Sequence, residues 1–245
     1  MQGKKLISAL ICTALFFSFF STAQAAVPVT GIPVSTGGSG HSLAIMNDGT
    51  LWGWGYNYQY QLGNSTRDNL ATPVNIMDDA VSVAAGSMHS LAVKSDGSLF
   101  GWGSNTYGQL GLSREGQTSD MNGSVKEYYS DTPVKIMDDA ASVAANGVYS
   151  YVIKNDSTLW AFGGDEKRGE YLIGDGTASK PAPVKVMDNV VLASAGGSNV
   201  LALKADGSLF IWGDNASGEI GDGTTTAHTK PVKVMDEVVT AAEGT

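Results

Sequence analysis

Two histidine–serine pairs are the first residues whose types could do chemistry. They are His41-Ser42 and His89-Ser90, and an aspartate follows each histidine seven residues later. Histidine, serine and aspartate are the residue types of a nucleophilic hydrolase. Two further copies of the surrounding sequence hold Tyr149 and Asn199 in place of the histidine. A position that accepts His, Tyr or Asn requires a hydrogen-bonding side chain rather than a general base, so we expect structural hydrogen bonds and no enzyme.

Pairs of acidic residues could serve acid–base catalysis or metal binding. They recur at one fixed place as Asp78-Asp79, Asp138-Asp139 and Asp236-Glu237, and the remaining copy is Asp188-Asn189. Turn and strand-end residues fit this recurrence better than a calcium or glycosidase site does. The Gly-Asp-Gly-Thr stretches at Gly174 and Gly221 lack both the spaced ligands of a calcium loop and the Gly-Lys-Ser/Thr of a phosphate loop. We therefore expect no metal site and no cofactor.

Tyrosines in polar segments are candidates for recognition. The candidate partner-binding residues are Tyr56, Tyr58, Tyr60, Tyr128, Tyr129 and Tyr171. Tyrosine offers a large contact area and a hydroxyl group at a low entropic cost. The alternative, that the rings only cover the edges of sheets, stays open. For Tyr107, which belongs to the repeated pattern itself, we favour that structural role.

All these residues lie in a sequence unit that occurs four times. Its first marker is Leu51-Trp52-Gly53-Trp54-Gly55, repeated from Leu99, Leu159 and Leu209; its second, Pro-Val-x-x-Met-Asp, begins at Pro73, Pro133, Pro183 and Pro231. The aromatic residues before the last glycine are 48, 60 and 50 residues apart. The extra residues of the longest repeat fall between Leu112 and Thr132, where we expect one longer loop in an unchanged unit.

Each unit predicts four short strands. In the second unit they are Val81–Ala85, His89–Lys94, Leu99–Gly103 and Val134–Met137. An Asp-Gly turn joins the middle two strands, and the third unit has Asn155-Asp156-Ser157 there, where Asn and Asp are expected to supply the left-handed residue. Four strands in each repeat of about 50 residues predict an all-β fold, a β-propeller of about four blades, each a four-stranded antiparallel sheet.

The aromatic–glycine alternation gives the third strand of each unit one bulky and one bare face. Phe100 and Trp102 share one face, and Gly101 and Gly103 share the other. We expect the aromatic face to fill the gap to a neighbouring blade. The glycine face is expected to let another backbone approach closely.

The stretch AAGSMHSLAVKSDGSLFGWGSNTYGQLG, from Ala84 to Gly111, resembles the repeat of the regulator of chromosome condensation (RCC1) family. The resemblance covers 34–245 and is weaker in the third unit, where GGDEKRGEYLIG replaces the loop pattern. The family usually closes a ring of seven blades, whereas this chain carries units at about 34–81, 82–141, 142–191 and 192–239 plus a partial fifth. We expect an incomplete, open ring whose end blades each leave an apolar face uncovered and favour self-association.

The first 25 residues predict a secretory signal peptide. Lys4 and Lys5 precede the apolar run Leu6–Phe20, which is too short to span a bilayer, and Ala23-Gln24-Ala25 follows. An uncleaved membrane anchor is the alternative. Cleavage after Ala25 would leave 26–245 as a secreted or cell-surface repeat domain without membrane attachment. Residues 26–245 contain no cysteine, which excludes a disulfide, a zinc–thiolate site and a thiol nucleophile there.

Charge and resemblance together narrow the function. Removal of 1–25 takes away two lysines and changes the formal net charge from −9 to −11. An acidic surface repels phosphate backbones, so we expect neither nucleic acid nor anionic membrane as a partner. The resemblance implies a non-enzymatic module that binds an extracellular protein through blade-connecting loops, as a secreted, bacterial-type member would. Binding of an extracellular or cell-wall glycan is the alternative, and guanine-nucleotide exchange, the family's best-known activity, is a further one.

Overall fold

The structure, a computed structural model, describes residues 34–36, 40–113, 118–122, 125–167 and 172–242, which lie in the unit Ile32–Thr245. The predicted signal peptide, 1–25, lies outside the described residues. All regular secondary structure in the described part is β-strand. Consequently, no described helix is long and apolar enough to cross a membrane.

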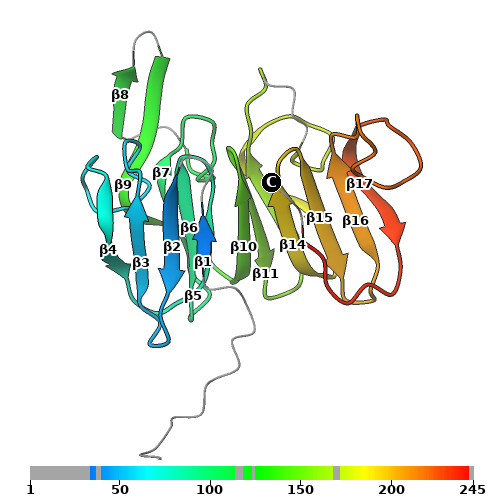
Figure 1. The fold of residues 1–245 in the computed structure, drawn as a ribbon, viewed down its shortest axis with the longest axis horizontal. Coiled ribbons are helices and arrows are strands. Elements are labelled where there is room, and N and C mark those ends of the chain that lie inside the picture. Colours follow the sequence, from blue (N-terminus) through cyan, green and yellow to red (C-terminus); the bar gives the residue numbers. More distant parts are fainter. Residues whose placement is uncertain (1–33, 37–39, 114–117, 123–124, 168–171, 243–245) are drawn as a thin grey trace, which may run out of the picture. The chain divides into compact units, whose positions relative to one another are not determined.

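Four antiparallel sheets follow one another along the chain (Figure 1). The first contains β1 (Val34–Thr36), β2 (His41–Ile45), β3 (Leu51–Gly55) and β4 (Leu70–Met77). The second contains β5 (Ala80–Ala85), β6 (His89–Lys94), β7 (Leu99–Ser104) and β9 (Val125–Met137). The third contains β10 (Ala140–Asn146), β11 (Tyr149–Lys154), β12 (Leu159–Gly163) and β13 (Lys180–Met187). The fourth contains β14 (Val190–Gly196), β15 (Asn199–Lys204), β16 (Leu209–Gly213) and β17 (His228–Met235). Each sheet is one repeat, so the predicted four-stranded antiparallel unit is confirmed.

The second sheet carries an additional strand. β8 (Thr118–Asn122) pairs with β9, which is 13 residues long, and the β8–β9 hairpin extends past the neighbouring strands (Figure 1). The expectation of one longer loop in an unchanged unit is therefore wrong. The signal that could have predicted the hairpin is the Asn-Gly pair at 122–123, because Asn-Gly is a preferred two-residue hairpin turn.

The turn between the middle strands requires a left-handed residue in every sheet. Three sheets hold glycine there, with φ between 82° and 84°. In the third sheet Ser157 takes this conformation, with φ 64°. The expectation that Asn155 and Asp156 provide the left-handed residue is therefore wrong. Asp156 instead accepts hydrogen bonds at Oδ1 from the backbone N and Oγ1 of Thr158, which fix the turn.

The middle strands pair in the same register in all four sheets. Ser42, Ser90, Ser150 and Val200 lie opposite Trp54, Trp102, Phe162 and Trp212, respectively. Residues directly opposite in an antiparallel pair share a face. We call this side of each sheet its aromatic face and the other side, which carries Leu43, Leu91, Tyr151 or Leu201, its aliphatic face.

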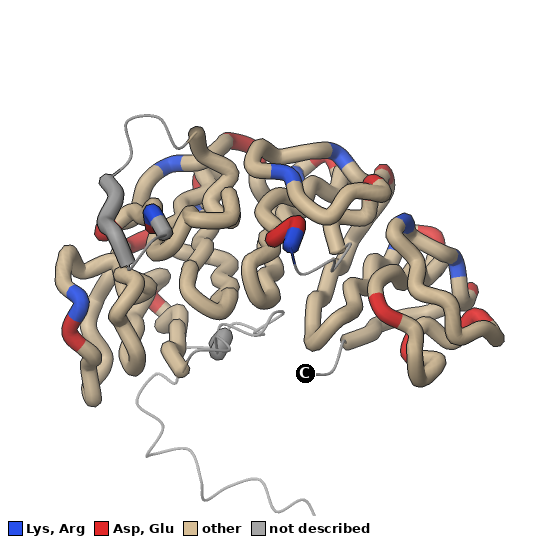
Figure 2. The backbone as a smooth tube through the Cα atoms, turned by 90° about the horizontal axis from the view of Figure 1, so that it is seen from above, with Lys and Arg blue, Asp and Glu red and all other residues tan. Residues whose placement is uncertain are grey.

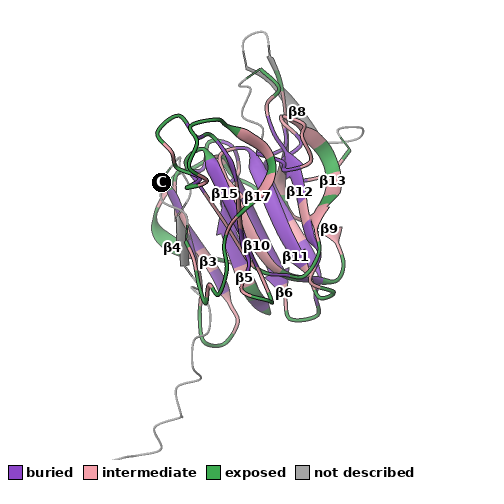
Figure 3. Cartoon of the chain, turned by 90° about the vertical axis from the view of Figure 1, so that its right-hand side faces the viewer, coloured by how far each residue is buried: buried purple, intermediate pink, exposed green. Residues whose placement is uncertain are grey.

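The aromatic face of each sheet packs on the aliphatic face of the sheet before it. Trp102 shares a hydrophobic cluster with Leu43 and Leu51, Phe162 with Leu91 and Leu99, and Trp212 with Tyr151 and Leu159. The three aromatic side chains are fully buried. Figure 3 shows the buried residues along these inner strands and the exposed ones in turns and outer strands. The predicted role of the aromatic face is confirmed.

The four sheets do not close into a ring (Figure 2), as the number of repeats predicted. The first sheet accordingly leaves its aromatic face partly uncovered, with Ser42, Ala44 and Trp54 only half-buried. At the fourth sheet the expectation of an uncovered apolar face is wrong.

The aliphatic face of the fourth sheet is covered by the segment after β17. Leu201 and Leu203 are 2% and 3% exposed, because Val238 and Ala241 pack in the same cluster. This segment begins as the first strand of a following sheet would. The Val238 N–H donates to the Gly207 carbonyl oxygen at 3.0 Å, and the corresponding bond at the start of each of the second, third and fourth sheets measures 2.8–2.9 Å.

The bare position of the third strand is filled by side chains of its own sheet. A Cβ built on Gly101 would lie 2.6 Å from Ile136 Cδ1 and 3.1 Å from Leu91 Cδ2. The expected close approach of a neighbouring backbone is therefore wrong at Gly101. It does occur at Gly103, where a Cβ would lie 3.3 Å from Cα of Gln61, in the loop between β3 and β4 of the first repeat.

In the third sheet a larger residue at the position of Gly101 is accompanied by a smaller residue at the position of Ile136. The first two sheets pair glycine with isoleucine (Gly53 with Ile76, Gly101 with Ile136), and the third pairs Ala161 with Val186. A methyl group gained on one strand is thus offset by one lost on the other. We expect Gly101→Ala to lower the free energy of unfolding by about 1–3 kcal/mol through overpacking.

Adding Ile136→Val to Gly101→Ala should restore most of that loss, because it removes a methyl group where the new Cβ needs space. A double-mutant cycle by urea unfolding measures the coupling between the two positions. Strictly additive effects would show that Ile136 is not the side chain that excludes a Cβ at position 101.

Candidate functional site

The histidine–serine pairs form between neighbouring sheets and not between adjacent residues. His41 Nε2 lies 2.9 Å from Ser90 Oγ, and His89 Nε2 lies 2.8 Å from Ser150 Oγ. The Ser90 hydroxyl donates to the Gln61 carbonyl oxygen at 2.7 Å, and Ser150 makes the equivalent bond. Because each serine hydrogen is directed at a carbonyl, the imidazole must donate its Nε2–H to the serine oxygen.

Burial keeps both imidazoles neutral. The side chains of His41 and His89 are fully buried. Desolvation lowers the pKa of His41 to about 4 and that of His89 to about 3, with a smaller contribution at His89 from the repulsion that a protonated His41 would exert. An imidazole that donates to a serine cannot remove a proton from it. These groups hold neighbouring sheets together, as structural hydrogen bonds.

The aspartates that follow the histidines belong to hairpin turns. Asp48 Oδ1 accepts hydrogen bonds from the backbone N and from Oγ1 of Thr50 at 3.0 and 2.7 Å, and these bonds lower the pKa of its carboxyl group. In the acidic pairs the second residue is left-handed, with φ 63° at Asp79 and 64° at Asp139. The interpretation as turn residues is confirmed. Within the described residues no three His, Cys, Asp or Glu side chains gather as a metal site would require.

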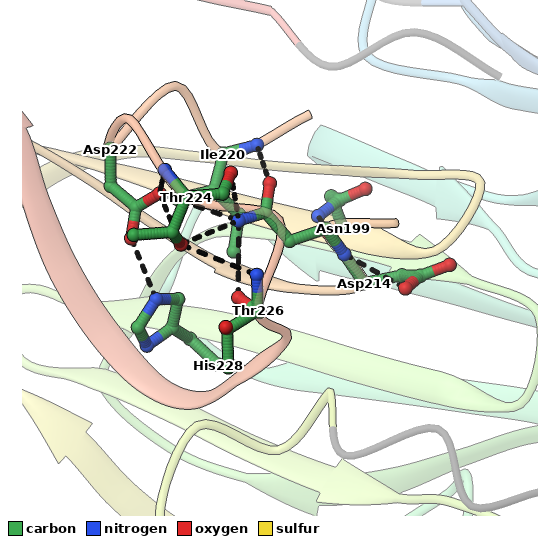
Figure 4. A network of polar contacts seen from close by, with 8 residues as sticks. Asn199, Asp214, Ile220, Asp222, Thr224, Thr226 and His228 are labelled. Carbon is green, nitrogen blue, oxygen red and sulfur yellow. Dashed lines mark hydrogen bonds and ion pairs between the residues drawn. The ribbon is translucent and has the colours of Figure 1, made fainter. Parts of the chain in front are cut away.

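An acid–histidine contact joins the loop after β16 to the first residue of β17 (Figure 4). His228 Nε2 lies 2.8 Å from Asp222 Oδ2. Hydrogen bonds from the backbone and side chain of Thr224, followed by His228, lower the pKa of Asp222 to about 2. Asn215 Nδ2 donates to the carbonyl oxygens of Thr224 and Thr226 at 3.0 and 3.1 Å. The network fixes this loop, which contains the Gly-Asp-Gly-Thr stretch that begins at Gly221.

Three of the predicted tyrosines meet where the loop after β3 lies against β9. The rings of Tyr60 and Tyr129 stack with centroids 4.4 Å apart and an interplanar angle of 22°. Arg67 Cζ lies 4.7 Å from the Tyr60 ring centroid and 5.3 Å from those of Tyr58 and Tyr129. Such distances permit cation–π attraction. We call these four residues the tyrosine–arginine cluster.

The cluster has a buried base and an exposed rim. Tyr129 is 6% exposed, whereas Tyr58 is 47% exposed and Tyr56, in the same loop, 36%. Tyr128 is half-buried. Tyr171, the remaining predicted residue, lies outside the described residues. A partner could therefore touch Tyr58 directly, while Tyr129 supports the ring of Tyr60 from below.

Tyr60 occupies a glycine position of the repeat. Its φ is 61°, and the equivalent residues of the second and fourth repeats are Gly108 and Gly218, with φ 78° and 82°. In all three the backbone N–H donates to the carbonyl oxygen three residues earlier, which for Tyr60 is that of Asn57. A left-handed non-glycine residue costs about 1–2 kcal/mol, so the tyrosine is held at this glycine position at a cost to the stability of the fold.

Arg67 is the residue of this cluster that was not predicted. It lies in a polar loop with no local motif, and it meets the rings only because the loop is held to β9. Gln59 Nε2 donates to Glu127 Oε2 at 3.0 Å, and the Ser65 N–H donates to the Asp131 carbonyl oxygen at 3.0 Å. The departure of Tyr60 from the glycine of its repeat was the available sequence signal.

Solved structures with this fold include human WBSCR16, 22% identical, with a TM-score of 0.68 over 84% of this chain and 54% of that one. Prp20p from Saccharomyces cerevisiae is 22% identical, with a TM-score of 0.63 over 81% and 49% of the two chains. Yeast RCC1 (Prp20) in complex with Kap60 is 21% identical, with a TM-score of 0.65 over 83% and 48%. The chain spans about half the length of these proteins. At sequence identities of 21–22%, the similarity to these structures shows only that the chain shares their fold.

The sequence itself matches two models of the regulator of chromosome condensation (RCC1) repeat. One matches 48–93, 96–147 and 206–244, and the other 34–61, 80–109 and 190–219. Most of the third repeat falls outside these ranges, in keeping with its weaker resemblance. No curated protein sequence matches significantly. Because the first model alone covers more than half of the 245 residues, the chain belongs to the family of proteins built from RCC1 repeats.

Proposed function

We propose that the chain is a secreted, non-enzymatic module that binds an extracellular protein through the tyrosine–arginine cluster and the loops beside it. The proposal depends above all on the residue type and conformation at position 60. The chain holds a tyrosine in a strained conformation where two of its own repeats hold glycine, and this tyrosine stacks in a partly exposed aromatic cluster. Packing within the blade does not require an aromatic ring at that position, because the other repeats fold without one.

The chemistry of the cluster suits a protein surface. Tyrosine and arginine are the residue types that dominate binding energy at protein interfaces. Arg67 lies over the rings, and Lys126 Nζ lies 5.1 Å from the ring centroid of Tyr128. Both place positive charge beside aromatic surface in a chain whose formal net charge is −9. The expected partner therefore presents carboxylates next to an apolar patch.

A glycan partner is the second candidate, because sugars stack on exposed aromatic faces. In this cluster one face each of Tyr60 and Tyr129 is covered by the other ring, and Arg67 Cζ lies 4.7 and 5.3 Å from the two ring centroids. That arrangement leaves less free ring surface for a sugar, which favours the protein partner. Nucleotide exchange rests only on the family name and on structures about 22% identical, so we do not adopt it.

The test compares exported wild-type chain with Tyr60→Gly. The amino terminus of the exported chain, expected at Ala26, is first determined by sequencing. The glycine variant relieves the backbone strain and loses one stacking contact, so its free energy of unfolding should stay within about 1 kcal/mol of wild type. Its affinity for the protein captured from culture supernatant or cell surface should fall at least about tenfold.

Met46→Ser is the matched control, because Met46 is 55% exposed and lies beyond the other end of β3. It should capture the same protein as wild type. Equal capture by wild type and Tyr60→Gly would contradict the proposed surface. Release of the partner by soluble glycan, or loss of capture after deglycosylation, would favour the second candidate.

A further inference from the structure

The contact between neighbouring sheets is built the same way three times. In each case an aromatic side chain lies on a loop glycine of the preceding sheet: Trp102 on Gly63, Phe162 on Gly111, and Trp212 on Gly174. A Cβ built on any of these glycines would lie only 2.8–3.1 Å from the ring. The glycine is therefore required by the ring that covers it.

Hydrogen bonds accompany this contact. The indole N–H groups of Trp102 and Trp212 donate to the carbonyl oxygens of Gln61 and Leu172 at 2.8 and 2.9 Å. Each acceptor lies two residues before the covered glycine. In the second sheet Ser90 donates to the same carbonyl as the indole. A complete contact thus joins one aromatic face to one glycine loop and its carbonyl.

The first sheet has the aromatic half of this contact, but no neighbouring sheet in the described part of the chain covers it. Trp54 and Ser42 occupy the positions of Trp102 and Ser90, yet both are only half-buried, whereas Trp102 and Ser90 are fully buried. No described residue accepts a hydrogen bond from the Trp54 indole.

The fourth sheet has the other half, a loop glycine and the carbonyl two residues before it, and no described aromatic ring covers that glycine. Gly221 occupies the position of Gly63 but is exposed, and a Cβ built on it would meet no atom within 4 Å. The Glu219 carbonyl, in the place of the Gln61 carbonyl, receives no hydrogen bond from the described residues. The segment after β17 already lies as the first strand of a following sheet.

We propose that the first sheet of one copy of this chain docks on the fourth sheet of a second copy, head to tail. The Trp54 ring would cover Gly221, and its indole would donate to the Glu219 carbonyl. A second copy is the occupant that the structure supports, because every copy carries both unpaired halves of a contact that its own sheets make three times. The contact joins unlike faces, so it is heterologous and forms rings or chains of copies.

In this contact β1 must be displaced by a segment of the other copy. Val34 pairs with Ala44 as Val83 pairs with Ala92, so β1 is the first strand of its sheet. The segment 238–242 of the preceding copy reaches the same position. We place that segment beside β2 of the next copy, in place of the three-residue β1. The tyrosine–arginine cluster, between the first and second sheets, takes no part, and partner binding can fail or hold independently of this contact.

Gly221→Asn tests the contact with Gly223→Asn as its control. The two glycines have φ of 77° and 83°, and neither Cβ would meet an atom within 4 Å. Asparagine tolerates this conformation. At position 221, however, its side chain takes the space assigned to Trp54. By sedimentation velocity, the purified chain should self-associate. Association should weaken at least about tenfold in Gly221→Asn and in Trp54→Thr, and stay unchanged in Gly223→Asn.

Cross-linking tests the head-to-tail geometry, because 26–245 contains no cysteine. Ser42→Cys and Glu219→Cys correspond to Ser90 and Gln61, which are hydrogen-bonded between sheets. A mixture of the two single variants should form covalent dimers with a short bismaleimide, and neither variant alone should do so. A chain that is monomeric at all concentrations would overturn the proposal. So would dimers of Ser42→Cys alone, or association that Gly221→Asn leaves unchanged.

Discussion

Replacing Trp102 with alanine should lower the free energy of unfolding by about 3–5 kcal/mol. The Trp102 side chain is fully buried between two sheets, where it shares a cluster with Leu43 and Leu51. Its indole N–H donates to the Gln61 carbonyl oxygen at 2.8 Å. Alanine leaves a cavity at the contact and an acceptor without this donor. Urea denaturation of wild type and variant measures the difference.

Two further variants separate the causes of this loss. Trp54→Ala, measured at a concentration where the chain is monomeric, changes the same residue in the first sheet, where it is half-buried, and should cost less than about half as much. Trp102→Phe introduces the residue that the third sheet has at Phe162, and it should cost about 1–2 kcal/mol for the lost hydrogen bond and volume. An equal cost for Trp102→Ala and Trp54→Ala would show that the sheets do not depend on the buried aromatic face.

Acidification from pH 6.5 towards pH 4 should destabilise the fold before most carboxylates titrate. The pKa values of His41 and His89 are about 4 and about 3 in the folded chain, below the value of 6.5 expected when unfolded. Between these values the unfolded chain binds a proton at each histidine and the folded chain does not. The stabilisation is therefore complete above pH 6.5 and falls with pH by about 1.4 kcal/mol per pH unit for each histidine.

His89→Asn provides the control, since the fourth repeat holds Asn199 at that position. The variant should lose about half of the pH dependence between pH 6 and 5, at some cost in stability at pH 7. The pKa values of Asp48 and Asp222 are shifted downwards, to about 2 at Asp222, so the stabilisation from these two carboxylates is lost only at lower pH, below about 3.8. Unfolding curves at pH 7, 6, 5 and 4 measure the effect. A stability that stays flat from pH 7 to pH 5 would contradict the buried, neutral state of the histidines.

The fold was predictable because its signals are local and repeated. Asp-Gly turns between apolar runs fix the hairpins, and the spacing of the tryptophans fixes the repeat. The sequence could exclude one hydrogen-bond partner of His41 but could not identify the actual one. Adjacent residues of a strand point to opposite faces, so His41 could not have paired with Ser42. That its partner is Ser90 follows only from the packing of one sheet on the next.

The candidate site was less predictable because it depends on long-range contacts. The residue type alone makes the tyrosines candidates, but the position of Arg67 depends on the loop being held to β9. The additional β8–β9 hairpin places Tyr129 under Tyr60. The volume exchange between Gly101 and Ile136 is likewise a cross-strand effect, visible in the sequence only once the register is known.

Site-specific photocross-linking tests the proposed binding surface most directly. A benzophenone amino acid replaces Tyr58, which is 47% exposed in the tyrosine–arginine cluster, or Met46, which is 55% exposed beyond the other end of β3. Both variants are exported by cells that contain the natural partner and are irradiated there. We expect one dominant protein adduct at position 58 and none at position 46. The same adducts at both positions, or no protein adduct at position 58, would contradict it.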